Sequence, residues 1–318
     1  MTYTYRQQTV STYLDALYAD GLRPSTKLST EEAVRTIGSI GIFRFKGYVK
    51  AVRERLDQCS LDDVLALYYF DHGLRLHLFD LASTIEIQLK AYLIEAVYAR
   101  TDNPFVYLER ESYLEEFSLS RDATKDWEMR IPKSKPKEEI YQHYRDYYLN
   151  KYDFGANFSA FLASRDLIDI KEDINYPPLH YFVESATLGT VIALLSRMVI
   201  SGEPIIKDIA NRFGFYQPKV FMGYLLRLKE VRNRCAHHGR MFNRNYRSVK
   251  AIGQHKRLRR TIYDHRMLDV YYTLYRLLGR EQQVAEQRAL EQRLIAGSQY
   301  PVENHIEEFI LNCMREKR

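Results

Sequence analysis

The chain has 318 residues, of which 46% are hydrophobic, so it has enough apolar side chains for a sizeable buried core. Its three cysteines, Cys59, Cys235 and Cys313, share no short spacing, which argues against a disulfide framework and against a four-ligand zinc module. The first ten residues contain no apolar run, and Glu184 and Arg197 interrupt the most apolar window, so we expect neither a signal peptide nor a membrane span. These features predict a folded cytoplasmic protein.

Apolar residues recur at helical spacing along most of the chain, and no series of alternating strands and hairpin turns is seen. The sequence therefore predicts an all-α fold. The clearest helix ends at Tyr98 and begins at Leu61 or at Asp71, depending on whether His72-Gly73 breaks it. Its apolar stripe consists of Leu78, Ala82, Ile85, Leu89, Tyr92 and Ala96.

Further elements follow in chain order. Residues 130–139 are polar and rich in proline, which predicts an exposed loop. A buried helix is expected over Leu179–Val199, and Gly202-Glu203-Pro204 ends it. Another helix runs from about Pro218 towards His238. We expect no internal repeat.

Positive charge is concentrated in one segment. Between Arg240 and Arg280 the sequence has eleven Lys or Arg against two acids, a local excess of +9 in a chain of net charge +6. Clustered cations of this kind can bind a polyanion through its phosphates, although a solvated helix face is the ordinary alternative. We expect residues 1–280 to form a single helical domain that includes this basic segment at 240–280, and residues 281–318 to form a helical extension.

The segment from Glu230 to Arg244 carries the chemistry. An apolar face precedes it at helical spacing, formed by Phe221, Leu225, Leu228, Val231 and Cys235. Arg232 falls within this stripe, and a guanidinium placed there needs a partner. Glu86, which flanks the apolar stripe of the first long helix, is a structural candidate, and an RNA phosphate held bidentately is the functional one.

Asn233 and His237 are four residues apart, so on an ideal helix they face the same way, while His238 points about a quarter turn away. A histidine can take the proton from a ribose 2′-hydroxyl or return one to the leaving oxygen at neutral pH. Arg232 beside it would neutralise the charge that builds on the phosphate oxygens, and Asn233 could orient either group. The set is suited to metal-independent transesterification.

Ordinary structural roles remain open for the same residues. Histidines at a helix C-terminus can complement the helix dipole, and Gly239 is expected to cap the helix. A zinc site of Cys235, His237 and His238 is disfavoured, because neighbouring helical positions diverge and no second Cys or His pair lies at ligand spacing. We expect no metal and no cofactor.

The run from Arg232 to Arg244 resembles the signature of the Abi-like (AbiD/AbiF) proteins of bacterial abortive infection, which belong to the HEPN superfamily. The resemblance includes upstream blocks at Gly41–Tyr48, Tyr69–Arg75 and Ile85–Lys90, and it resumes at Pro177-Pro178-Leu179-His180 with Glu184 and Gly189. It covers roughly residues 30–250, and several ordered blocks make it more specific than the spacing of one Arg and one His.

The resemblance implies an all-α, HEPN-like helical bundle core with additional helices. In many relatives an Arg-x4-6-His motif is a metal-independent endoribonuclease site, and on it Arg232 matches the arginine, Asn233 the frequent polar second residue and His237 the histidine. Because the motif allows four to six residues between the arginine and the histidine, His238 also remains a candidate for the histidine. The resemblance also implies a homodimer, since many HEPN proteins build the site across a two-fold axis, and it implies RNA as partner, including a structured non-coding RNA.

The leading interpretation is thus a dimeric endoribonuclease of phage defence. The alternative is a non-catalytic protein that forms a stable complex with a structured non-coding RNA, and a third is a structural protein in which Arg232 serves packing alone. In the first two, basic residues beyond the motif would hold the RNA backbone. These residues are Arg240, Arg244, Arg247, Lys250, Lys256, Arg257, Arg259 and Arg260.

Overall fold

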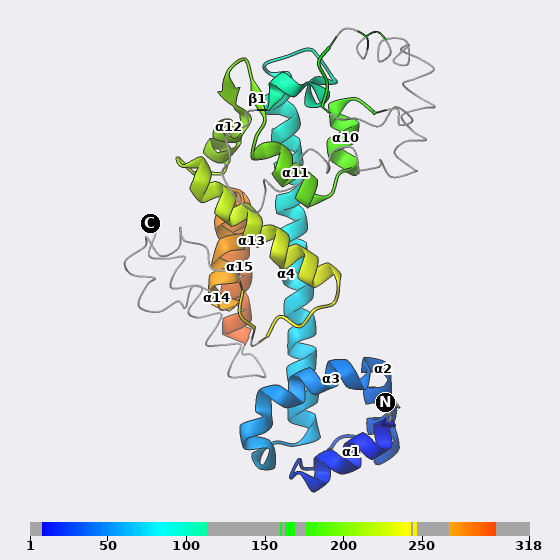
Figure 1. Ribbon diagram of the computed structural model, residues 1–318. Coiled ribbons are helices and arrows are strands. Elements are labelled where there is room, and N and C mark those ends of the chain that lie inside the picture. Colours follow the sequence, from blue (N-terminus) through cyan, green and yellow to red (C-terminus); the bar gives the residue numbers. More distant parts are fainter. Residues whose placement is uncertain are drawn as a thin grey trace, which may run out of the picture. The chain divides into compact units, whose positions relative to one another are not determined.

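The computed structural model describes residues 8–113, 160, 163, 165–168, 176–242, 244–246 and 267–296. Within these residues the chain forms ten α-helices and one two-stranded hairpin (Figure 1), so the predicted all-α fold is confirmed. None of the described helices combines the length and the hydropathy needed to cross a bilayer.

Internal contacts divide the chain into two compact units. The described parts of Met1–Phe79 and Arg234–Asn245 form unit 1, and those of Asp80–Asn233 and Tyr246–Arg318 form unit 2. Compact units are defined by contacts and not by independent folding, so the expected domain over residues 1–280 and the extension over 281–318 stay predictions.

Unit 1 is built from short helices and the beginning of one long helix. Its elements are α1 (Val10–Ala19), α2 (Thr30–Ile40), α3 (Ile42–Val49), the 3-10 helix η1 (Lys50–Gln58) and the first part of α4 (Leu61–Tyr98). Successive elements pack on one another, α1 on α2, α2 on α3 and α3 on η1. Their apolar faces form a core of Tyr13, Leu14, Leu17, Leu22, Ile37, Phe45, Tyr48, Val64 and neighbouring residues.

Local chemistry sets where α2 and α3 begin. The Ser29 hydroxyl accepts from the Glu32 amide, and the Glu32 carboxylate accepts from the Ser29 amide, which is a capping box at the start of α2. Gly41 joins α2 to α3 with a φ of 86°, a backbone conformation that glycine adopts without steric cost. The two helices can therefore follow each other with a single residue between them.

The helix α4 runs without a break from Leu61 to Tyr98, so His72-Gly73 does not interrupt it. Asp71 and Arg75 form an ion pair one helical turn apart across this point, with Oδ2 and Nη1 separated by 3.0 Å. This ion pair stabilises the helix around Gly73, which is exposed and has a low helix propensity.

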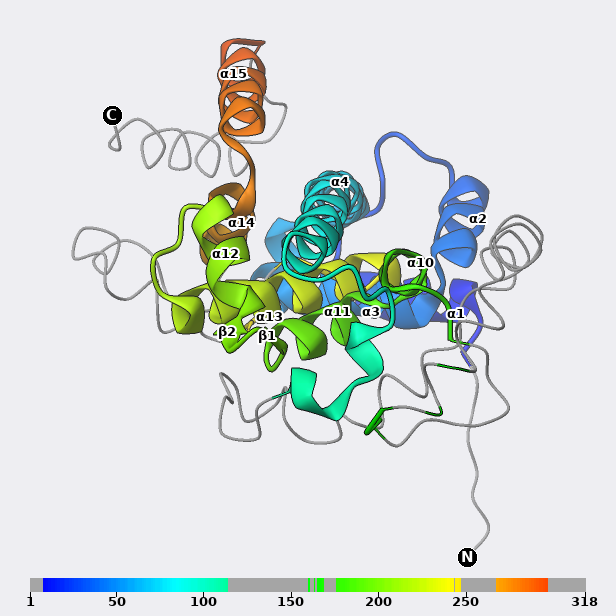
Figure 2. The same cartoon turned by 90° about the horizontal axis from the view of Figure 1, so that it is seen from above.

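The second part of α4 belongs to unit 2. Its remaining elements are η2 (Val106–Leu108), η3 (Arg110–Ser112), α10 (Leu179–Ser185), α11 (Leu188–Leu195), β1 (Val199–Ile200), β2 (Glu203–Pro204), α12 (Ile205–Arg212), α13 (Pro218–Ala236), α14 (Met267–Leu277) and α15 (Arg280–Ala296). Viewed nearly along α4, α11 and α13 lie on the same side of that helix (Figure 2). Polar and aromatic contacts link α4 to its neighbours, namely Gln88–Gln282, Tyr92–Phe213 and Tyr98–His180.

The expected single helix over Leu179–Val199 is wrong in detail, because the chain forms α10 and α11 separated by a short break. Thr187 lies in an extended conformation, and its hydroxyl accepts from the Thr190 amide, which starts a new helix. Sequence periodicity did not reveal this cap, because the apolar pattern continues on both sides of Thr187.

Candidate functional site

The helix α13 begins at Pro218, a residue favoured in the first turn because it has no amide hydrogen to leave unpaired. Its predicted apolar face is buried, with exposed fractions of 6% or less at Phe221, Leu225, Leu228, Val231 and Cys235. Arg232 follows Val231 directly and keeps 32% of its side chain exposed. Its guanidinium therefore lies at the margin of the core, where it can reach both a buried partner and solvent.

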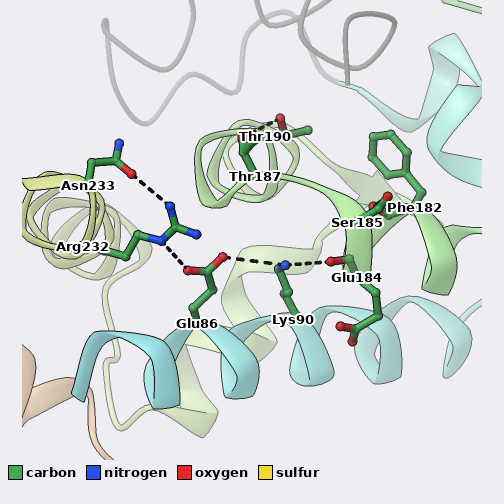
Figure 3. Close-up of polar contacts among 9 residues, drawn as sticks. All are labelled: Glu86, Lys90, Phe182, Glu184, Ser185, Thr187, Thr190, Arg232 and Asn233. Carbon is green, nitrogen blue, oxygen red and sulfur yellow. Dashed lines mark hydrogen bonds and ion pairs between the residues drawn. The ribbon is translucent and has the colours of Figure 1, made fainter. Parts of the chain in front are cut away.

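An ion pair fixes Arg232 to α4. Its Nε donates to Oε2 of Glu86 at 3.0 Å, and Glu86 is only 11% exposed (Figure 3). The second Glu86 oxygen lies 3.7 Å from Nζ of Lys90, one turn along α4, and Lys90 donates to the Glu184 carbonyl at 3.0 Å. Glu86 thus lies between two cations, Arg232 and Lys90, and its contact with Nε fixes the orientation of the Arg232 guanidinium.

Asn233 completes this cluster in unit 2. Its side-chain oxygen accepts from Nη1 of Arg232 at 3.4 Å, so the amide and the guanidinium lie side by side (Figure 3). No described residue hydrogen-bonds to Nη2 of Arg232. A guanidinium anchored at Nε, with Nη2 left for another acceptor, can bind one further anion.

The two histidines lie just beyond the end of α13, which closes at Ala236, and both side chains are exposed. The helix ends one residue before His237, so the expected alignment of His237 with Asn233 on one helical face stays a prediction. The amide of His238 donates to the Cys235 carbonyl at 3.0 Å and that of Gly239 to the Arg234 carbonyl at 2.8 Å. This pair of bonds is a Schellman motif.

The left-handed position of that motif is occupied by His238, with a φ of 54°, and not by Gly239 as expected. Gly239 is required for a different reason, since a Cβ there would lie 2.8 Å from Cγ and 3.2 Å from the carbonyl oxygen of Arg234. A left-handed backbone costs a residue with a Cβ about 1–2 kcal/mol. The turn therefore keeps an imidazole where glycine would be favoured.

A buried carboxylate in unit 1 fixes the chain that follows the histidines. Asp71, 0% exposed, accepts through Oδ1 from the amides of Met241 at 2.9 Å and Phe242 at 2.5 Å. Its Oδ2 accepts from the Tyr48 hydroxyl at 2.6 Å and from Arg75 at 3.0 Å. The Asp71 carboxylate thus has four donors, which is why its burial is tolerated.

Sequence reasoning missed Asp71 as a residue of the site. Arg75 extends the same network, since its Nη2 lies 2.9 Å from Nδ1 of His72. Burial and the Asp71 carboxylate raise the pKa of Tyr48 above its ordinary range, so the phenol stays a donor. The sequence signals were the spacing of Asp71 and Arg75, four residues apart on one helix, and their place in the block Tyr69–Arg75. The backbone partners near Met241 have no signature of their own.

Two of the predicted RNA-contact residues are described, and both belong to unit 1. Arg240 donates from Nη1 to the Gly47 carbonyl and lies 6.0 Å from the centre of the Tyr48 ring, while Arg244 is exposed. The other predicted contacts lie outside the described residues, and these are Arg247, Lys250, Lys256, Arg257, Arg259 and Arg260.

Burial determines the chemistry of the cysteine in the motif. It raises the pKa of the Cys235 thiol to about 12, against the opposing effect of the Arg75 charge, so this thiol is not a ready nucleophile or metal ligand. Across the residues that the structure describes, no three His, Cys, Asp or Glu side chains come together as a metal site.

The structure therefore brings Arg232, Asn233 and Glu86 together in unit 2, whereas His237, His238 and Arg240 belong to unit 1. The chain is thus an all-α protein with an anchored arginine near the end of a helix, followed by two exposed histidines. The sequence model of the Abi-like protein family matches residues 35–243. The chain belongs to this family of abortive-infection proteins. No curated protein and no solved structure gives a significant match.

Proposed function

We propose that this Abi-like protein is a metal-independent endoribonuclease of phage defence. The observation that supports it best is the state of Arg232, whose Nε is anchored by Glu86 while Nη2 has no partner among the described residues. Lys90 offsets much of the Glu86 charge, so the cluster keeps a net positive character towards an incoming phosphate.

The proposed reaction is an internal transesterification of RNA. His237 accepts the proton of a ribose 2′-hydroxyl, whose oxygen attacks the adjacent phosphorus while the bond from phosphorus to the 5′-oxygen breaks. Arg232 neutralises the charge on the non-bridging oxygens, and Asn233 orients it. The leaving 5′-oxygen takes up a proton, so the products carry a 2′,3′-cyclic phosphate and a 5′-hydroxyl.

Cleavage of this kind uses one proton acceptor and one proton donor. In the proposal, a second copy of the chain supplies the donor through its own motif, which makes the active form a homodimer in which each chain has the same role. The exposed His238 is the other donor that the motif offers. The basic segment from Arg240 onward holds the RNA backbone through its phosphates.

The test compares wild type with His237→Ala, His238→Ala and Arg232→Ala on end-labelled RNA in EDTA, with mapping of the product ends. Arg212→Ala is the matched control, because Arg212 is also a helical arginine of unit 2, 38% exposed and paired with a glutamate, Glu95. We expect cleavage by wild type and Arg212→Ala, and a loss of at least 100-fold in His237→Ala and Arg232→Ala.

Two outcomes would contradict the nuclease. If neither wild type nor the variants cleave RNA, but all copurify with one RNA of discrete length, the protein is the non-catalytic RNA-binding partner instead. If cleavage stops in EDTA and returns with a divalent ion, the metal-independent mechanism is wrong.

A further inference from the structure

The helix α3 presents an aromatic ring to solvent beside a buried face of the same helix. Phe43 is 94% exposed, whereas Phe45 and Tyr48 are fully buried and Val49 is 3% exposed. The buried residues fix α3 in the core of unit 1, so Phe43 is held on a rigid support and adds nothing to that core. An aromatic ring so exposed is available to a partner.

Basic side chains flank this ring. Arg44, Lys46 and Lys50 are exposed, and no acidic residue occurs between Gly41 and Arg53. Phe43, Lys46 and Lys50 follow at intervals of three and four, which is one face of a helix. No described carboxylate forms an ion pair with these three cations, although Lys46 also contacts Gln8 and the Tyr13 ring.

The same helix contacts the segment that follows the histidines. Arg240 donates to the Gly47 carbonyl, and a Cβ at Gly47 would lie 3.6 Å from Nη1 of Arg240, so the two chain segments approach closely. Arg240 is three residues beyond His237, and both belong to unit 1. A strand of RNA bound along α3 would therefore lie near the exposed histidines.

We propose that the exposed surface of α3 and the first residue of η1, formed by Phe43, Arg44, Lys46 and Lys50, binds an unpaired segment of RNA. The Phe43 ring stacks on one base and the cations hold the adjacent phosphates, a combination that suits single strands. Paired bases are already stacked, and side chains reach them poorly in the deep groove of an RNA helix. The inference rests on the proposed nuclease and deepens it, because it makes the substrate single-stranded at the site.

A second copy of the chain is the competing occupant of this face. Protein interfaces are depleted of lysine, whereas Lys46 and Lys50 both flank Phe43. The charge therefore favours a polyanion.

The experiment measures RNA affinity by fluorescence anisotropy in a His237→Ala background, which prevents cleavage. The probes are a 12-nucleotide unpaired RNA and a blunt duplex of the same length, and the variants are Phe43→Ala, Phe43→Leu and Phe43→Trp. Tyr216→Ala is the matched control, because Tyr216 is an equally exposed aromatic residue, at 95%, on unit 2.

We expect Phe43→Ala and Phe43→Leu to weaken single-strand binding about tenfold, while Phe43→Trp and Tyr216→Ala leave it intact. Duplex affinity should not change. Arg44→Ala with Lys50→Ala should lower the dependence of log affinity on log salt by about 1.4, since each contact on a single strand contributes about 0.7. Thermal melts should show that these surface variants fold as wild type does.

Each result separates the inference from the function on which it rests. Unchanged single-strand affinity in Phe43→Ala, with cleavage by wild type, overturns the inference and leaves the nuclease intact. If Phe43→Ala lowers the molar mass by light scattering and not the RNA affinity, the face belongs to a second copy. If wild type neither binds nor cleaves RNA, the nuclease itself is wrong and the inference falls with it.

Discussion

Arg232 on α13 and Glu86 on α4 form an ion pair across 146 positions of sequence, with Nε and Oε2 separated by 3.0 Å. The two partners differ in burial and in their other contacts. Glu86 is nearly buried and also contacts Lys90, whereas Arg232 remains about one-third exposed. Removing one partner or the other should therefore have different consequences.

Glu86→Ala is expected to lower the free energy of unfolding by about 2–4 kcal/mol, because it leaves Lys90 buried without its carboxylate. Arg232→Ala should cost about 1 kcal/mol or less, since Lys90 still neutralises Glu86 and Arg232 is partly solvated. Urea unfolding at neutral pH measures both. An Arg232→Ala protein that does not fold would instead show that this arginine serves packing.

Asp71→Ala should be among the most destabilising substitutions in unit 1, by about 3–5 kcal/mol, because it leaves Arg75 buried without a counter-charge. Hydrogen exchange should accelerate at the amides of Met241 and Phe242, which lose their acceptor. Asp20→Ala is the control, since the exposed Asp20–Arg53 pair should contribute less than about 1 kcal/mol. Unaltered exchange at the two amides would contradict the anchoring role of Asp71.

Substitutions at the neighbouring residues His238 and Gly239 should change the free energy of unfolding in opposite directions. His238→Gly should raise the free energy of unfolding by about 1 kcal/mol through relief of the left-handed backbone. Gly239→Ala should lower it, because the new Cβ meets Arg234. Urea unfolding of the two variants measures this difference. Cleavage retained in His238→Gly would assign the proton transfer to His237, whereas its loss would assign a role to His238.

Stability should fall at alkaline pH because of Cys235. Its pKa in the folded chain is about 12, above the ordinary value of 9.0, so its contribution is complete below pH 9 and is lost as pH rises towards 12. We expect the difference in unfolding free energy between wild type and Cys235→Ala to shrink by about 1.4 kcal/mol per pH unit in that window. Denaturant titrations at pH 8, 10 and 11 provide the measurement, and parallel pH profiles of the two proteins would refute the assignment.

Periodicity predicted much of the helical framework from the sequence. The spacing from Leu78 to Ala96 gave the body of α4, and Pro218 gave the start of α13, because helix burial has a strong local signature. What failed was a helix boundary, because Thr187 starts a new helix inside an apolar run.

The site was predicted only where side chains carry a pattern of their own. Arg232, with Glu86 as its candidate partner, could be found from a helical wheel, since Arg232 falls within one apolar stripe and Glu86 flanks another. The hydrogen bonds from the amides of Met241 and Phe242 to Asp71 could not be predicted, because almost every residue has the same backbone donor. The left-handed backbone of His238 could not be foreseen either, since glycine stands beside it.

The link between Asp71 and Met241 has a consequence for synthesis on the ribosome. The amide of Met241 follows Asp71 by 170 positions, and the whole stretch Asp80–Asn233 of unit 2 is translated between them. A chain released before residue 241 would carry Asp71 without the main-chain donors that the finished protein supplies. The segment Arg234–Asn245 is thus the last part of unit 1 to be translated, so a product that stops before residue 237 retains the helices α1, α2 and α3 but lacks both His237 and His238.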